Sequence, residues 1–292
     1  MMMFAGLVVV FGAVAGGYLM HGGVLMVLWQ PAELVIIGGS AIGSLIVSTP
    51  PRVLKEMMVQ LKTVMIGPPR SGDYIDLLEL LYKVFKQAQQ QGVMALEPQF
   101  ENPHESPLLT KHPKFMARHH SVALLADSIK IMIVGGIQAH DLEALLDEDL
   151  HAHHDAALAP SKALNRIGDA LPGLGIVAAV LGVVITMGHI DGPPAEIGEK
   201  IGAALIGTFL GILLSYGAAQ PIAQALEQRV ADDEFYNLCI KAGLMALHKG
   251  HAPAVAIEFA RRVLPHAVRP SFEETEKFCR AATSPAASQQ AA

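Results

Sequence analysis

The polar side chains inside the long apolar segments of this chain are mostly hydroxyls. Thr186, Thr208, Ser215 and Tyr216 all stand in such segments. A hydroxyl oxygen can line a path and solvate an ion, but it does not titrate near neutral pH. Hydroxyls alone therefore cannot bind and release protons as a carboxylate does, and their placement favours ion passage or packing over covalent catalysis.

A histidine-rich stretch is the other candidate group. His151, His153 and His154 follow the acidic residues at 147–149, and both side-chain types bind metals. Their spacing along a helix does not place all three imidazoles on one face. A solvated surface is therefore favoured over a metal site, and the histidine pair at 119–120 is expected at the surface as well.

The signatures of soluble enzymes are missing from the sequence. No P-loop, dinucleotide fingerprint or nucleophile-and-base arrangement stands out, so we predict no enzyme activity, no cofactor and no metal. The formal net charge of −6 argues against a nucleic-acid partner. Hydrophobic residues make up 52% of the chain and charged residues only 16%, against about 25% charged in soluble domains. The elements that hold these hydroxyls are therefore expected in a membrane.

Four apolar runs predict four membrane spans, at about 2–21, 34–51, 170–190 and 201–222, since a spanning helix needs about 20 apolar residues. Buried core helices are the alternative, which four such runs in one chain disfavour. A cleaved signal peptide is the alternative for the first run, disfavoured because no basic residue precedes it. Glu33 separates the first two runs, so no predicted span contains Asp, Glu, Lys or Arg.

The basic residues predict the topology. Of the 21 Lys and Arg, all but Lys200 lie in residues 52–169 and 227–292, and basic segments stay in the cytoplasm. Both termini are therefore expected in the cytoplasm of a multi-pass inner-membrane protein. The predicted domains are a membrane hairpin (1–51), a cytoplasmic helical domain (52–169), a second membrane hairpin (170–226) and a cytoplasmic tail (227–292), disordered from about 284.

The cytoplasmic segments read as helices, so the fold class is an all-α membrane protein. Asp73 begins a helix that ends before Gly92, a second helix runs from about 113 to 134, and a third begins at Asp141. The stretch 98–113 is expected to be a loop. The fourth span is expected to continue to Lys249, followed by helices at about 253–263 and 271–281.

Small residues and prolines recur inside the spans. Gly12 and Gly16, Gly39 and Gly43, and Gly207 and Gly211 each form a G-x-x-x-G pair, which lets helices approach closely. The sequence leaves open whether these faces pack within one chain or between chains. Pro172 is expected in the first turn of its span, where proline is tolerated, whereas Pro221 is expected to kink a continuing helix; the two are either hinges or tolerated membrane prolines.

Long runs of this sequence resemble the MotA family, the A subunits of bacterial flagellar motor stators within the MotA/TolQ/ExbB superfamily. The runs Asp169–Val184 and Gly207–Gly217, with Pro221 after them, are similar to that family's third and fourth spans. Glu101–Ser106 and Arg269–Phe272 are similar to its cytoplasmic segments. The resemblance covers almost the whole chain.

The resemblance implies an ion-conducting motor subunit. Five A subunits would surround two B subunits, each carrying a membrane aspartate and a peptidoglycan-binding domain. Ion flow past that aspartate would turn the A ring, which pushes on the rotor switch protein. This agrees with the spans, because an ion carrier usually holds an ionisable group at depth and no predicted span has one.

The resemblance also implies roles for single residues. Pro172 and Pro221 match the prolines that couple ion flow to movement, and Thr208 matches the threonine near the partner aspartate. Glu97 matches the acidic rotor contact. Ala179 stands where sodium-driven members carry a threonine, so the translocated ion is expected to be H⁺.

The basic rotor contact departs from the family pattern, because Gln89 stands in its place. Lys86 or Lys83 could substitute for it, or the contact could depend more on Glu97. Two other functions stay open: an energiser of outer-membrane transport like TolQ and ExbB, which has three spans with one before the cytoplasmic domain, and a static membrane scaffold.

Overall fold

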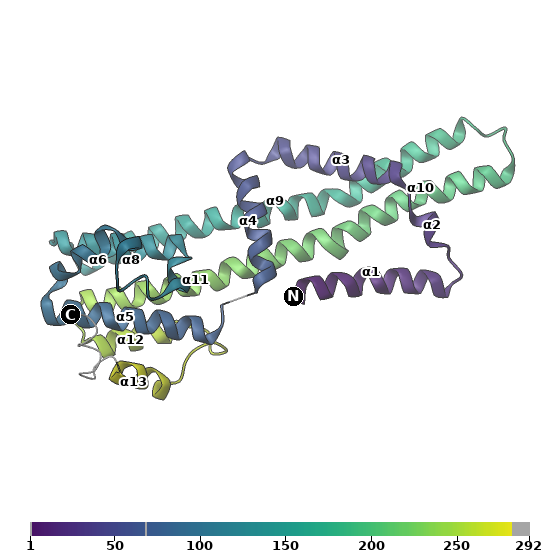
Figure 1. Cartoon of the computed structure of the whole chain (residues 1–292). Coiled ribbons are helices and arrows are strands. Elements are labelled where there is room, and N and C mark those ends of the chain that lie inside the picture. The colour runs from purple at the N-terminus through teal and green to yellow at the C-terminus, as the bar shows by residue number, and fades with distance from the viewer. Residues whose placement is uncertain (1, 68, 282–292) are drawn as a thin grey trace. The chain divides into compact units, whose positions relative to one another are not determined.

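The computed structural model describes residues 2–67 and 69–281, and within these ranges the regular structure is helical (Figure 1). The predicted all-α fold class is confirmed. The helices are α1 (Met2–Met20), α2 (Leu25–Leu28), α3 (Pro31–Ser48), α4 (Pro51–Ile66), α5 (Ser71–Gln91), η1 (Val93–Leu96), α6 (Glu97–Glu101), η2 (Pro103–Glu105), α7 (Pro113–Met116), α8 (His119–Val134), α9 (Ala139–Met187), α10 (Pro194–Leu214), η3 (Ser215–Ala219), α11 (Gln220–His248), α12 (Pro253–Arg262) and α13 (Phe272–Ala281).

Within the described ranges, four helical segments are long and apolar enough to cross a membrane, in agreement with the four predicted spans. They lie within Met2–Met20, Leu25–Ser48, Ala139–Met187 and Pro194–His248. The last two are much longer than a bilayer requires. Helix α9 therefore carries both an apolar span and a polar extension, and α11 is the polar continuation of the apolar α10.

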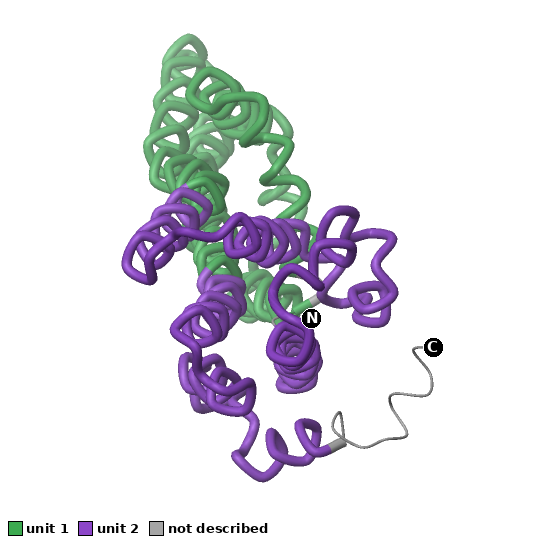
Figure 2. Tube along the Cα trace, turned by 90° about the vertical axis from the view of Figure 1, so that its left-hand side faces the viewer, with its two compact units in different colours: residues 1–67, 156–230 green, residues 68–155, 231–292 purple. Residues whose placement is uncertain are grey.

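The chain forms two compact units, each made of two stretches of sequence (Figure 2). Residues 1–67 and 156–230 form the unit that holds the apolar spans, and residues 68–155 and 231–292 form the other. The predicted domain boundaries stay a prediction, and the predicted disordered end from about 284 lies outside the described residues.

The second unit has a well-defined hydrophobic core. Helix α5 buries one face because its leucines recur at helical spacing, including Leu77, Leu78 and Leu81, all without exposed surface. The backbone N–H of Arg70 donates to the Asp73 carboxylate at 2.8 Å, which satisfies a free donor at the start of α5. The helix ends at Gly92, whose φ of 85° suits glycine. Its predicted end before Gly92 is confirmed, whereas the helix begins at Ser71 rather than at Asp73.

Three other helix predictions need correction. The helix predicted from 113 to 134 is divided into α7 and α8, with a break at residues 117–118, and the predicted loop at 98–113 contains α6 and η2. The helix beginning near Asp141 does not end before the third span. Helix α9 is continuous for 49 residues and contains Pro160 and Pro172.

Candidate functional site

The centre of the membrane unit is a close approach of α9 to α10 through glycines. A Cβ added at Gly211 would lie 2.7 Å from the Leu171 carbonyl oxygen and 2.8 Å from the Gly175 Cα. Side chains cannot fit where backbones meet this closely. The Gly207–Gly211 pair therefore packs within the chain.

The other two glycine pairs are not used in this way. Among the described residues, no atom lies within 4 Å of where a Cβ would stand at Gly12, Gly16, Gly39 or Gly43. The sequence left open whether the glycine pairs pack within one chain or between chains. The Gly207–Gly211 pair packs within the chain, whereas the other two pairs face open space in the isolated subunit.

The same contact brings Ala179 and Thr208 to one level of the helix pair. A Cβ at Gly207 would lie 3.2 Å from the Ala179 backbone nitrogen, and one at Gly175 would lie 3.3 Å from the Thr208 Cα. Both Ala179 and Thr208 are partly buried. Two residues that the sequence placed on different spans therefore lie at adjoining positions.

A carboxylate also reaches this level, which corrects the prediction that no span contains an ionisable residue. Glu33 lies in the first turn of α3, inside the apolar segment Leu25–Ser48, and only 7% of it is exposed. Its Oε2 lies 2.7 Å from where a Gly207 Cβ would stand, and Oε1 lies 3.6 Å from that point at Gly182. Oε2 has no hydrogen-bond partner among the described residues.

The sequence did contain a signal for Glu33. Its carboxylate stands alone between two apolar runs, and the second predicted span begins one residue after it. Helix α3 begins earlier, at Pro31, because proline is favoured at the first helical position. A span boundary drawn at the helix start rather than at the charge would have included Glu33.

Pro172 lies in the interior of α9, so its predicted place in a first helical turn is wrong. A proline has no N–H, and it leaves the carbonyl four residues earlier without its helical partner. That carbonyl belongs to Gly168, and it accepts a hydrogen bond of 2.6 Å from the Ser215 hydroxyl. The helix passes through the proline because another element satisfies the freed oxygen.

Pro221 follows a π-helical segment, η3 (Ser215–Ala219), rather than a simple proline kink. Such segments often mark functional positions in helices. Gln220, the neighbour of Pro221, donates from Nε2 to the Asp169 carboxylate at 2.9 Å. A Cβ at Gly168 would lie 2.8 Å from the Gln220 side chain. The segments around the two prolines are therefore in contact.

The predicted rotor-contact residues lie in the other unit. Gln89 is exposed near the end of α5, and Glu97 is exposed at the start of α6. The Gln87 side-chain amide donates to the Ala95 carbonyl at 3.3 Å, which joins α5 to the segment just before Glu97. Lys83 pairs with Glu79 at 2.7 Å, and Lys86 is partly buried. The structure thus presents Glu97 to solvent.

The histidine predictions are partly corrected. Among residues 2–67 and 69–281, no group of three or more His, Cys, Asp or Glu is arranged to hold a metal ion. His120, predicted at the surface, instead stacks on His153 with ring centroids 3.4 Å apart. Burial lowers the pKa of both imidazoles, and Asp149 opposes this shift. The pair is a stacked contact between α8 and α9.

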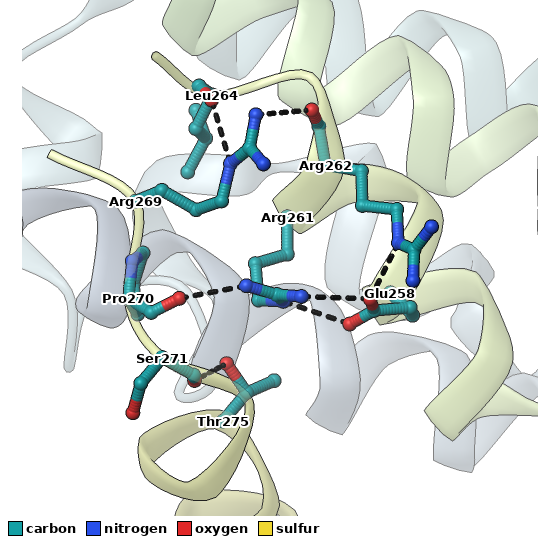
Figure 3. Close-up of polar contacts among 8 residues, drawn as sticks. All are labelled: Glu258, Arg261, Arg262, Leu264, Arg269, Pro270, Ser271 and Thr275. Atoms are coloured by element: carbon teal, nitrogen blue, oxygen red, sulfur yellow. Dashed lines mark hydrogen bonds and ion pairs between the residues drawn. The ribbon is translucent and has the colours of Figure 1, made fainter. Parts of the chain in front are cut away.

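The tail segment Arg269–Phe272 is held by a network of arginine side chains (Figure 3). Arg261 makes two hydrogen bonds of 2.7 Å to Glu258 and donates to the Pro270 carbonyl at 2.9 Å. Arg269 donates to the Leu264 and Arg262 carbonyls. The hydrogen bonds from Arg261, followed by those from Arg262, lower the pKa of Glu258 to about 2. These hydrogen bonds fix the turn between α12 and α13.

Comparisons with known proteins match the chain in two parts. Residues 4–92 match the family model described as "Motility protein A N-terminal", and residues 114–235 match "MotA/TolQ/ExbB proton channel family". The chain is 41% identical to Motility protein A of Escherichia coli K12 over 286 residues, which covers 98% of this chain and 97% of that protein. It is 37% identical to Chemotaxis protein LafT of Vibrio parahaemolyticus, covering 95% and 98%.

Two solved structures share the fold. A chain of the C. jejuni MotAB structure superposes with a TM-score of 0.75 at 19% identity, covering 92% of this chain and 98% of that one. A chain of the flagellar MotAB stator complex from Bacillus subtilis superposes with a TM-score of 0.73 at 21% identity, with the same coverage. These likenesses concern the arrangement of the helices.

Proposed function

Because this chain belongs to the MotA family and is the A-type subunit of a flagellar motor stator, we propose that its α9–α10 pair couples ion passage to movement. The observation that carries this proposal is the glycine contact that brings Ala179 and Thr208 together. The bonded segments beside Pro172 and Pro221 support it. The ion path runs along these residues in the assembled complex.

The partner is a MotB-like B subunit, which the similarity to two MotAB structures supports. Five A subunits surround two B subunits, the termini are cytoplasmic, and the inner membrane's lipids surround the exposed apolar faces. The B subunit contributes a membrane aspartate. Glu33, buried beside Gly207, is a second carboxylate near the path, supplied by this chain itself.

The ion is H⁺. Ala179 has no side-chain oxygen that could replace water around sodium, and this chain matches a proton channel family. We expect the rotation speed to follow proton-motive force and to be independent of external sodium. The measurement is the speed of tethered cells as sodium is replaced by potassium at constant proton-motive force. A speed that rises with sodium contradicts a proton path.

Pro172→Ala tests the coupling. Alanine restores the N–H that bonds the Gly168 carbonyl within α9, so the helix stiffens at this point. We expect paralysed cells with normal flagellar filaments and a normal amount of stator complex in the membrane. Pro160→Ala is the matched control, because Pro160 lies in the same helix outside the α9–α10 contact.

Unchanged swimming of the Pro172→Ala strain would instead support a static scaffold. The transport-energising alternative is already disfavoured, because such proteins have three spans, whereas the described part of this chain has four candidate spans, two of them before the cytoplasmic segment.

The exposed carboxylate of Glu97 contacts the FliG-like rotor switch protein. We expect Glu97→Lys to reduce torque more than Gln89→Ala, since the first reverses a charge and the second removes a neutral amide. Single exposed pairs contribute only about 0–1 kcal/mol, so a partial loss of torque is expected. Bead assays measure the torque, with Glu101→Lys as the control on the same helix. Equal effects of the Glu97 and Gln89 variants would defeat this assignment.

A further inference from the structure

The Ser215 hydroxyl makes a hydrogen bond that its own helix does not explain. Serine and threonine inside a helix usually donate to the carbonyl three or four residues earlier, as Ser128 does to Leu124 and Thr186 does to Gly182. Ser215 instead crosses to α9 and donates to the Gly168 carbonyl over 2.6 Å. This oxygen is available because Pro172, four residues later, has no N–H to bond it.

Because its surroundings are apolar, the Gly168 carbonyl oxygen needs the Ser215 hydroxyl as its hydrogen-bond donor. Ser215 has no exposed surface, and Gly168 is buried. The neighbouring Ile167, Leu171, Leu214 and Ala219 belong to the apolar cluster of the membrane unit. A carbonyl left without a donor in apolar surroundings is costly, so the bond favours the conformation in which η3 lies against the Pro172 segment.

The π-helical segment places Ser215 at the point where this contact is needed. Ser215 is the first residue of η3, and Gln220 directly follows its last residue. The Gln220 side-chain amide donates a hydrogen bond to Asp169. Two side-chain hydrogen bonds thus join positions 168 and 169, just before Pro172, to positions 215 and 220, just before Pro221. The hydrogen bond between Gln220 and Asp169 is exposed, whereas the one between Ser215 and Gly168 is buried.

We propose that Ser215 is a latch residue: its hydroxyl, bound to the carbonyl that Pro172 frees, holds the two proline-containing helices together between movements. Ser215 is a positioning residue and does not contact the ion. Movement of one helix past the other breaks this bond, and the return stroke restores it. The link to movement rests on the proposed coupling function, whereas the hydrogen bond to the freed carbonyl does not.

A double-mutant cycle tests the latch without requiring a working motor. The full stator complex, with its B subunit, is purified in lipid nanodiscs, and its melting temperature is measured for Ser215→Ala, Pro172→Ala and the double variant. We expect Ser215→Ala to lower the melting temperature in the Pro172 background and to lower it by less in the Pro172→Ala background. In the latter, the restored N–H of residue 172 already occupies the Gly168 oxygen.

Tyr216→Phe is the control, because it removes a neighbouring hydroxyl that is 63% exposed; it should leave the melting temperature unchanged in both backgrounds. An equal loss for Ser215→Ala in both backgrounds would mean simple packing and overturn the latch. So would no loss in either. If Pro172→Ala yields no complex, amide hydrogen exchange at residues 168–176 decides: faster exchange in Ser215→Ala than in Tyr216→Phe supports the bond, and equal exchange overturns it.

A motor measurement then separates a positioning role from a purely structural one. Tethered cells with Ser215→Ala should rotate at least about twofold more slowly at an unchanged amount of membrane-assembled complex, since the resting geometry is no longer held. Tyr216→Phe cells should match the parent strain. A melting-temperature cycle with the expected coupling but unchanged rotation would overturn the latch as a device of the motor while leaving the bond established.

Discussion

Replacing Gly211 by alanine should abolish swimming and lower the melting temperature of the stator complex. The new methyl group would meet two backbone atoms, the Leu171 carbonyl oxygen at 2.7 Å and the Gly175 Cα at 2.8 Å. Backbone cannot rotate away as a side chain can, so α9 and α10 must separate. Overpacking of this kind costs about 1–3 kcal/mol, and the displacement also moves Ala179 away from Thr208.

The control for this experiment is Gly202→Ala in the same helix, because among the described residues no atom outside its own helical backbone lies within 4 Å of its Cβ position. Both variants gain helix propensity from the same exchange of residues, so a difference between them isolates the helix contact. Thermal unfolding of the purified complex and swimming in soft agar are the two measurements. A Gly211→Ala strain that swims like the Gly202→Ala strain would show that the close approach is not needed for function.

Glu33→Gln should slow tethered cells by roughly tenfold or more, since positioned proton-transfer groups contribute about 10²–10⁴ in enzymes. Glutamine keeps the shape and the polarity of the side chain but cannot bind and release a proton. The amount of complex in the membrane should stay the same. Glu196→Gln is the control, because Glu196 lies in the first turn of α10 as an exposed partner of Lys200.

Gly207→Ala complements this experiment. Its methyl group would displace the Glu33 carboxylate, whose Oε2 occupies the position 2.7 Å away, while leaving the carboxyl group able to ionise. Slow rotation in both variants supports a carboxylate that must ionise at this place. Normal rotation of Glu33→Gln together with slow rotation of Gly207→Ala would assign Glu33 to packing.

The gross architecture was predictable because its physical signals are strong. Runs without charge must be removed from water or placed in lipid, so the four spans could be found from the distribution of Asp, Glu, Lys and Arg. Helix α5 was predictable from its apolar spacing and from Gly92 at its end. The resemblance to MotA located Pro172 and Thr208, whose roles no composition rule would assign.

The details that were missed depend on contacts between elements. Rules for water-soluble helices predict that Pro172 begins a helix, but α9 continues through it because Ser215, from another segment, satisfies the freed carbonyl. Glu33 was placed in a loop because charge marked the span boundary, whereas two glycines on other helices make room for its carboxylate. Neither contact leaves a periodic pattern in the sequence.

The π-helical segment has a consequence for how this chain can change over evolutionary time. A π turn holds one residue more than an α turn, so a π segment behaves as a one-residue insertion that the helix has absorbed. Every residue from Gln220 onward is turned by about 100° from the direction that an uninterrupted α-helix would give it. Deletion of one residue within 215–219 would remove this offset and present a different face of α11, which makes the length of this stretch more constrained than its composition.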